Sequence, residues 1–126
     1  MDEVRLHRPE PGEDAFIPKR YEFRVNSRRL IVGVEPELIL GRRNNDDPND
    51  EVSIDLQRFG ASGLGVSRKH AQLLIEAGDV FLVDLDSSNG TRLNGKALKP
   101  NQPYRLRDGD EMELGRLRII IRLLPA

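Results

Sequence analysis

Apolar and polar side chains alternate along most of this chain in short segments. In residues 21–25, 52–56, 71–75 and 117–123 the apolar side chains recur at every second position. This period of two is typical of β-strands that bury one face. Residues 30–34, 38–40, 80–85 and 91–93 form further short runs of strand length. We find no amphipathic helix of three turns, so the pattern predicts a chain of short strands.

Turn-forming residues separate the predicted strands. Gly, Asn, Asp and Pro supply the positive or fixed φ angles that turns require. Such residues gather at positions 26–27, 35–36, 77–79, 88–90, 94–95, 100–101 and 108–110. Many short strands at regular spacing favour an all-β fold, an antiparallel β-sandwich.

Residues 1–20 differ from the rest of the chain. They contain Pro9, Pro11 and Pro18, many charges and few apolar side chains. We interpret them as a flexible N-terminal arm or linker. Residues 21–124 are then the folded domain. A chain of 126 residues is long enough for one domain that folds without a metal or a disulfide.

The composition argues against several classes of partner. The net charge is −1, and the 33% of residues that are charged carry both signs. We therefore expect no general attraction to nucleic acid. No apolar run approaches the roughly 20 residues of a membrane helix, and the first residues lack the basic and apolar regions of a signal peptide. We therefore expect a cytoplasmic domain without a membrane partner. The absence of cysteine is compatible with the reducing conditions of the cytoplasm.

Three short polar motifs lie at the ends of predicted strands. Taken singly, each is explained as an ordinary solvated turn, and an Asn-Gly pair between strands is a strong hairpin signal. A lone histidine before a strand is most often a structural hydrogen-bonding residue. The motifs, in chain order, are Gly41-Arg42, Ser67-Arg68-Lys69-His70 after a glycine-rich stretch, and Ser88-Asn89-Gly90-Thr91 followed by Asn94-Gly95.

An acidic segment covers residues 46–51. Clustered carboxylates are the ligands that Ca²⁺ prefers. This segment lacks the alternating ligands and the central glycine of a calcium loop, however, and Pro48 interrupts it. We interpret it as an exposed loop, and we expect neither a metal site nor a cofactor in this chain.

In their order and spacing, the three motifs resemble those of the forkhead-associated (FHA) domain, a module that recognises phosphothreonine peptides. The resemblance covers about residues 21–123 and includes the later turns Leu106 to Asp110 and Leu114-Gly115. It implies a β-sandwich of about eleven strands whose loops at one end bind the peptide. It also implies a phosphothreonine-containing partner and an upstream Ser/Thr kinase.

The resemblance further implies roles for single residues. Phosphothreonine carries a charge of about −1.5 to −2, which a planar Arg fork meets through two hydrogen bonds. The positions that contact the phosphate in the family are matched by Arg42, Ser67, Arg68 and Ser88. The position that holds the peptide backbone is matched by Asn89. The positions that shape the site are matched by Gly41, His70, Gly90, Thr91 and Asn94.

The chain departs from the family pattern between Arg42 and Ser67. This stretch is long, because it contains both the acidic segment and the glycine-rich residues 60–65. Some relatives carry a basic residue two positions before the motif serine, and it reads the third residue after the phosphothreonine. Here that position is Gly65, so we expect a weak charge preference there unless Arg43 or Arg68 substitutes.

Two other functions compete with phosphopeptide binding. The same fold can serve as a phosphate-independent interaction scaffold, whose clearest sign would be the loss of residues such as Arg42, Ser67 and Asn89. A hydrolase could use Ser67, His70 and Asp84. The chain has no Gly-x-Ser-x-Gly nucleophile elbow, and a serine and a histidine three positions apart at a strand start compete for one turn. We therefore expect a binding module rather than an enzyme.

Overall fold

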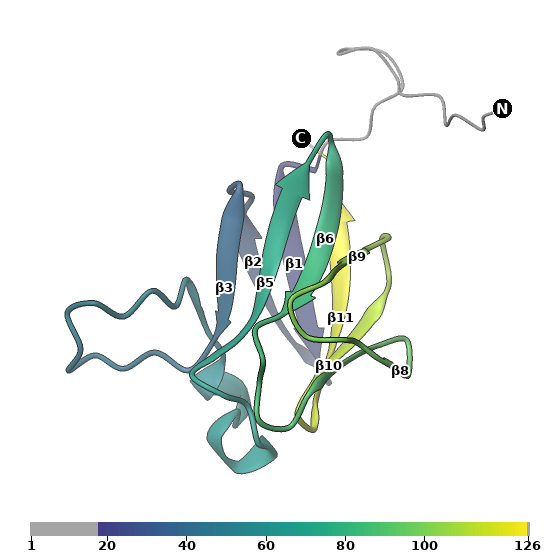
Figure 1. Ribbon diagram of the computed structural model, residues 1–126. Helices are drawn as coiled ribbons and strands as arrows, with labels where there is room; N and C mark the ends of the chain where they lie inside the picture. Colours follow the sequence, from purple (N-terminus) through teal and green to yellow (C-terminus); the bar gives the residue numbers. More distant parts are fainter. Residues whose placement is uncertain (1–17, 126) are drawn as a thin grey trace, which may run out of the picture.

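The computed structural model describes residues 18–125. In it the chain forms a β-sandwich of two sheets (Figure 1). One sheet has six strands in the order β2-β1-β11-β10-β7-β8, and the other has five in the order β4-β3-β5-β6-β9. The strands are β1 Arg20–Val25, β2 Arg28–Gly33, β3 Glu37–Gly41, β4 Ile54–Asp55, β5 Lys69–Glu76, β6 Asp79–Asp84, β7 Thr91–Leu93, β8 Lys96–Ala97, β9 Pro103–Arg105, β10 Glu111–Leu114 and β11 Leu117–Leu124. The predicted all-β sandwich is confirmed.

Almost all of the strand pairs are antiparallel, and the pair of β3 with β4 is parallel. β1 pairs with β11 along its length, so that Tyr21 lies opposite Leu123. This pairing joins the two ends of the domain that we predicted at residues 21 and 124. The predicted arm falls mostly outside the described residues, and its last residue, Arg20, already belongs to β1.

One predicted strand is wrong in part. Of residues 52–56, only Ile54 and Asp55 are extended. Asp55 then caps a short 3₁₀-helix, η1 (Leu56–Phe59), by accepting a hydrogen bond from Gln57 N at 3.1 Å. Val52, Ile54 and Leu56 are nevertheless all buried. The alternation therefore predicted the buried residues correctly, but a side-chain cap ended the strand.

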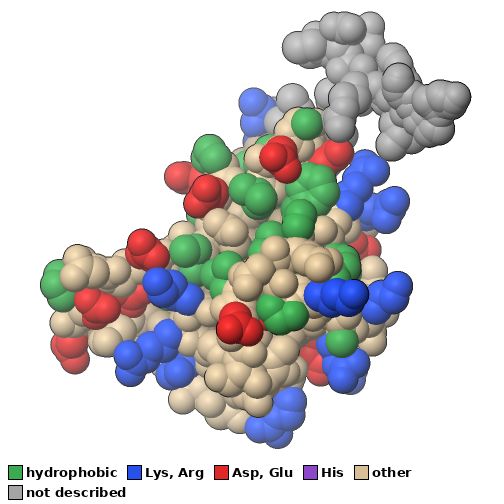
Figure 2. Space-filling view, in the orientation of Figure 1, with side chains coloured by type: hydrophobic (Ala, Val, Ile, Leu, Met, Phe, Trp, Pro, Cys, Tyr) green, Lys and Arg blue, Asp and Glu red, His purple; other side chains and the backbone are tan. Residues whose placement is uncertain are grey.

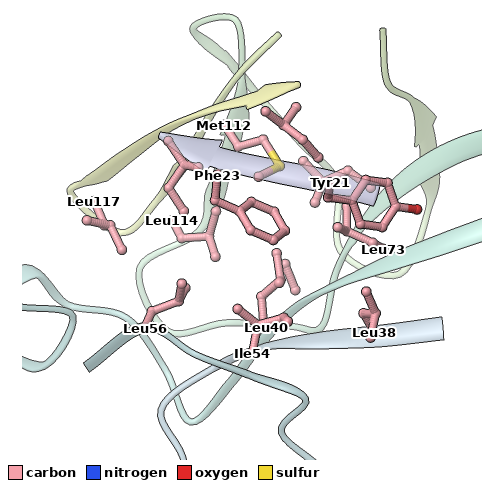
Figure 3. Close-up of a cluster of buried hydrophobic side chains, with 14 of the residues drawn as sticks. Tyr21, Phe23, Leu38, Leu40, Ile54, Leu56, Leu73, Met112, Leu114 and Leu117 are labelled. Atoms are coloured by element: carbon pink, nitrogen blue, oxygen red, sulfur yellow. The ribbon is translucent and has the colours of Figure 1, made fainter. Parts of the chain in front are cut away.

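The inner faces of the two sheets form a single apolar core (Figure 3). The alternating residues of β1 and β11 face this core, and Phe23, Ile119 and Ile121 are completely buried. The rings of Tyr21 and Phe23 lie 6.1 Å apart at a tilt of 46°. Full burial of each large apolar side chain contributes about 1.5–3 kcal/mol to stability. This core makes the sandwich a rigid base for its loops.

The pairing of β3, β5 and β6 brings the sequence motifs to the same end of the sandwich. Antiparallel pairing sets Gly41, the last residue of β3, opposite Lys69, the first residue of β5. The next pairing sets Ala71 of β5 opposite Asp84, the last residue of β6. The loops that leave these strands therefore meet at the lower end in Figure 1, together with η1, a second 3₁₀-helix η2 (Ser62–Leu64) and the β10–β11 turn.

The fold predicts an unusual response at Tyr21. Its hydroxyl is buried without a hydrogen-bond partner among residues 18–125, and burial raises the pKa of Tyr21 to about 12. An unpaired buried polar group costs about 1–3 kcal/mol. We therefore expect Tyr21→Phe to increase the free energy of unfolding by about 1 kcal/mol in urea titrations, whereas Tyr21→Ala should lose about 3–5 kcal/mol.

The same substitution has a pH signature. The pKa of the hydroxyl is 10.0 when unfolded and about 12 when folded. Ionisation therefore favours the unfolded chain, and the stability of the fold is unaffected by this group below pH 10 and falls as the pH rises from 10 toward 12. Tyr21→Phe should reduce this alkaline loss. A destabilised Tyr21→Phe domain would contradict this explanation and would indicate a hydrogen bond to the hydroxyl.

Candidate functional site

The end of β3 is shaped by a close backbone approach at Gly41. A Cβ atom at this position would lie 1.7 Å from the carbonyl oxygen of Arg68, so no residue other than glycine fits without a backbone shift. Arg42 N then donates to that same carbonyl at 2.9 Å. Gly41 thus allows the β3–β4 loop to lie directly against the start of β5.

The side chain of Arg42 is held in place by one hydrogen bond. Its Nε donates to the carbonyl oxygen of Val66 at 2.7 Å, and the residue is half-buried. No acceptor among residues 18–125 contacts its two terminal nitrogens. A guanidinium that is anchored through Nε keeps its paired terminal N–H groups available for an oxyanion.

His70 connects two loops from a completely buried position. Its Nδ1 accepts a hydrogen bond from Ser67 N at 2.9 Å, and its Nε2 lies 2.9 Å from the carbonyl oxygen of Gly90. Because a backbone N–H can only donate, Nδ1 carries no proton and Nε2 donates. Burial lowers the pKa of His70, although the Gly90 bond and the charge of Asp84 oppose this. The neutral imidazole therefore braces the site.

Ser67 forms a second link between the same loops. Its hydroxyl oxygen accepts a hydrogen bond from Ser88 N at 3.1 Å. Arg68, the next residue, is exposed and has no side-chain partner among the described residues. The geometry does not assemble a hydrolytic triad, because His70 contacts a backbone N–H and a carbonyl rather than a serine hydroxyl.

Asp84 organises the β6–β7 loop, a role that the sequence pattern did not reveal. It is buried at the end of β6, and its Oδ1 accepts from Ser87 Oγ at 2.5 Å and from Thr91 Oγ1 at 2.6 Å. Its Oδ2 also accepts from Ser87 N at 3.2 Å. The signal that could have found it is an acidic residue just before a hairpin turn that is rich in hydroxyl groups.

Asn89 lies at the exposed tip of this loop and reaches the glycine-rich stretch. Its Nδ2 donates to the carbonyl oxygen of Gly65 at 2.9 Å. Gly65 has a φ of 78°, and a Cβ there would lie 2.7 Å from Asn89 Nδ2. Gly65 is therefore required for the position of Asn89. No acceptor or donor among residues 18–125 contacts Asn89 Oδ1.

Most of the predicted site residues come together at this end, but Asn94 lies elsewhere. It occupies the β7–β8 turn, where its Oδ1 accepts from Glu111 N at 2.9 Å and its Nδ2 donates to Asp110 Oδ1 at 3.0 Å. Asn94 thus ties the β7–β8 hairpin to β10. The residues that the loops do bring together are Gly41, Arg42, Ser67, Arg68, His70, Ser88, Asn89, Gly90 and Thr91.

The acidic segment forms a separate loop beside the site (Figures 1 and 2). Asp50 accepts hydrogen bonds from the backbone N–H groups of Asn44 and Val52, and these bonds lower the pKa of Asp50. Its carboxylate therefore supports the loop. Within residues 18–125 no group of three metal-ligating side chains occurs, and none of the described helices has the length and apolarity to cross a membrane.

The geometry of His70 predicts a linked loss of stability and a pH dependence. Removal of one partner of a buried hydrogen bond costs about 1–3 kcal/mol, so His70→Ala should lower the free energy of unfolding by that amount. The folded pKa lies below 6.5. The contribution of neutral His70 is therefore present above pH 6.5 and is lost as the pH falls below it. Urea titrations between about pH 5 and pH 8 test both statements, and an unchanged wild-type stability across this range would contradict them.

A known protein family and individual proteins resemble this region in sequence. The FHA domain family model matches residues 38–115. The glycogen accumulation regulator GarA of Mycolicibacterium smegmatis is 38% identical over 115 residues, which cover 91% of this chain and 63% of that protein. Protein FraH of Nostoc sp. is 39% identical over 71 residues, which cover 55% of this chain and 24% of that protein. The chain thus spans less than two thirds of the length of these relatives.

A solved structure from a study of phosphothreonine-dependent FHA domain interactions also has this fold. It is 27% identical, covers 85% of this chain and 99% of its own, and superposes with a TM-score of 0.63. The family model spans more than half of the sequence and includes all three motifs. The chain therefore belongs to the FHA domain family.

Proposed function

We propose that this domain binds phosphothreonine-containing proteins in Ser/Thr kinase signalling in the cytoplasm. The observation that carries the proposal is the direct linkage of the three loops that hold Arg42, Ser67 and Ser88. Arg42 N donates to the carbonyl of Arg68, and Ser67 accepts from Ser88 N. His70 then bridges the two serine loops. Phosphate-binding groups from distant parts of the chain therefore share one rigid framework.

The phosphate would lie between cations and hydroxyl groups. Arg42 presents its unpaired terminal nitrogens, and Arg68 supplies a second exposed cation. The hydroxyls of Ser67 and Ser88 can donate to phosphate oxygens. A dianionic phosphate with several acceptor oxygens fits this set of donors better than a single carboxylate does.

The peptide backbone would lie across Asn89. Its amide nitrogen is already committed to the carbonyl of Gly65, so the amide plane is held in one orientation. The Oδ1 atom, together with the second N–H of the amide, can then pair with an N–H and a C=O of an extended peptide. Asn89 thus recognises the main chain independently of its sequence.

The rival functions have less support. The clearest sign of the scaffold alternative would be the loss of Arg42, Ser67 and Asn89, whereas all three are present at the loop end. Calorimetry with a phosphothreonine peptide and its unphosphorylated twin tests the proposal directly. Equal binding of the two peptides would favour the phosphate-independent scaffold.

Arg42 offers the sharpest test of the phosphate site. Loss of a charge-assisted hydrogen bond costs about 1.5–3 kcal/mol, so Arg42→Ala should weaken phosphopeptide binding roughly 10- to 150-fold in fluorescence anisotropy. Arg42→Lys should recover little, because a point charge cannot replace a planar fork. Arg105→Ala removes the same charge from β9, where Arg105 pairs with Asp79, and should leave affinity unchanged. Binding by Arg42→Ala near the wild-type level would refute the assignment.

The second ligand prediction is selectivity for phosphothreonine over phosphoserine. The two differ by one γ-methyl group, which we place in a small pocket near Ser88 and Asn89. Burial of a methyl contributes about 0.8 kcal/mol, and a fitted pocket extends discrimination to roughly 10- to 200-fold. Matched peptides should show this ratio in anisotropy titrations. Equal affinities would remove the methyl pocket from the proposed site.

A further inference from the structure

The six-stranded sheet has one long edge strand, β2, which lies at one side of the rear sheet in Figure 1. The other edge strands, β8 of the same sheet and β4 and β9 of the second sheet, contain only two or three residues, whereas β2 contains six. Among residues 18–125, β1 is the only strand that pairs with β2. Short edge strands protect a sheet from pairing with other chains, and a long one offers its free backbone groups to another strand. β2 is therefore the edge at which a further strand could be added.

The free backbone groups of β2 belong to every second residue. Val25 and Arg28 flank the two-residue turn of the β1–β2 hairpin, and the residues that flank such a turn form a hydrogen-bonded pair. Hydrogen-bonded positions recur at every second residue, so the even-numbered residues of β2 bond to β1. The bond from Val34 N to the carbonyl of Lys19 at 3.2 Å continues this pattern. The residues whose N–H and C=O groups point away from β1 are therefore Arg29, Ile31 and Gly33.

The two arginines of β2 are engaged within their own domain. Arg29 forms an ion pair with Glu22 of β1 at 3.0 Å, and Glu22 is buried. The guanidinium of Arg28 lies over the ring of Phe59, 5.1 Å from its centroid. Charged side chains on an edge strand commonly prevent the addition of another strand. Because both arginines make contacts inside the domain, they protect the edge less than free arginines would.

The remaining side chains of β2 are apolar and at least partly exposed. Ile31 lies opposite Glu22 on the outer face of the sheet, and at 41% exposure it is the one large hydrophobic residue within residues 18–125 that is fully exposed. Leu30 and Val32 are only partly buried against the core. An added Cβ at Gly33 would meet no atom within 4 Å. The strand therefore offers apolar contacts and open space to a partner strand, in addition to its backbone groups.

One antiparallel register makes β2 complementary to a second copy of itself. It places Ile31 opposite Ile31 of the second copy. Leu30 then lies opposite Val32, so apolar side chains meet on both faces of the sheet. Arg29 lies opposite Gly33, which avoids the destabilising pairing of like charges. The residues with free backbone groups also face one another in this register, so they can exchange hydrogen bonds in pairs.

We propose that the free edge of β2 pairs with β2 of a second copy of this chain, with a two-fold axis at Ile31. The two six-stranded sheets then form one continuous sheet. Such an interface uses the same surface of both copies and closes after two chains. The proposal does not depend on phosphothreonine binding, because no residue of the candidate site takes part in it. Because the paired strands are antiparallel, the loop ends of the two copies would face opposite directions.

Sedimentation equilibrium measures the association directly. An interface built on one pair of strands is smaller than that of most stable dimers. We therefore expect the average mass of the wild type to rise from one chain toward two chains between about 10 μM and about 1 mM. Ile31→Lys should stay monomeric throughout, because it places two ammonium groups opposite each other at the axis. Ile120→Lys is the matched control on the same face of the sheet, where Ile120 lies opposite Arg24 and Glu111, and it should associate as the wild type does.

A cysteine cross-link tests the register. The chain contains no cysteine, so Ile31→Cys introduces a single thiol. Opposite residues in a hydrogen-bonded antiparallel pair have Cα atoms about 5.5 Å apart, which a disulfide spans. Ile31→Cys should therefore form a covalent dimer in oxidised glutathione, seen on non-reducing gels. Gly33→Cys is the control on the same strand and face. In this register its two thiols would lie roughly 13 Å apart along the strands, so it should form roughly tenfold less covalent dimer.

Each outcome supports or overturns the proposal. An association that Ile31→Lys abolishes and Ile120→Lys retains supports it, as does preferential cross-linking of Ile31→Cys. A wild type that remains monomeric up to about 1 mM overturns it and leaves the edge of β2 to a strand of another protein. A dimer that persists in Ile31→Lys also overturns it, because another surface then makes the contact. Equal cross-linking of the two cysteine variants overturns the register. Thermal unfolding shows that each variant is folded under the conditions of the test.

Discussion

Four successive backbone carbonyls, those of residues 63–66, hold the binding end of this domain together. They accept hydrogen bonds from Arg42, Asn89 and Arg116, which lie on three different loops. Backbone carbonyls are strong acceptors whose direction is set by the main chain. A single short segment therefore helps to position side chains from three loops that are far apart in the chain. The candidate site depends on the shape of this segment more than on any one contact.

That shape depends in turn on glycine and on two buried polar groups. Gly65 and Gly115 have positive φ, and a Cβ at either would collide with the neighbouring loop. His70 in its neutral form ties the segment's next residue, Ser67, to Gly90, and Asp84 holds the β6–β7 turn. Because these hydrogen bonds already restrain the loops, a ligand that binds at this end would lose less affinity to the ordering of the backbone.

The sequence predicted the fold well because alternation is a local property. Where one face of a strand is buried, as in residues 21–25 and 117–123, the apolar side chains recur at every second position. Residues 52–56 show the limit of this reasoning. Their alternation is real and their apolar side chains are buried, but the carboxylate of Asp55 satisfies the backbone of a 3₁₀ turn and ends the strand. Competition between a strand and a cap is decided by geometry that the pattern does not contain.

The sequence by itself also determined the three motifs and, through their order, the family. It could not assign a role to Asp84 as the brace of the β6–β7 turn, to Asn94 as a link to β10, or to Arg116 as a link from the β10–β11 turn to Gly63. Arg116 and its acceptor Gly63 are 53 residues apart. Only the pairing of strands into two sheets brings such residues within hydrogen-bond reach. Strand periodicity is encoded between neighbours in the chain, whereas the walls of a binding site arise from contacts between loops that the sandwich places together.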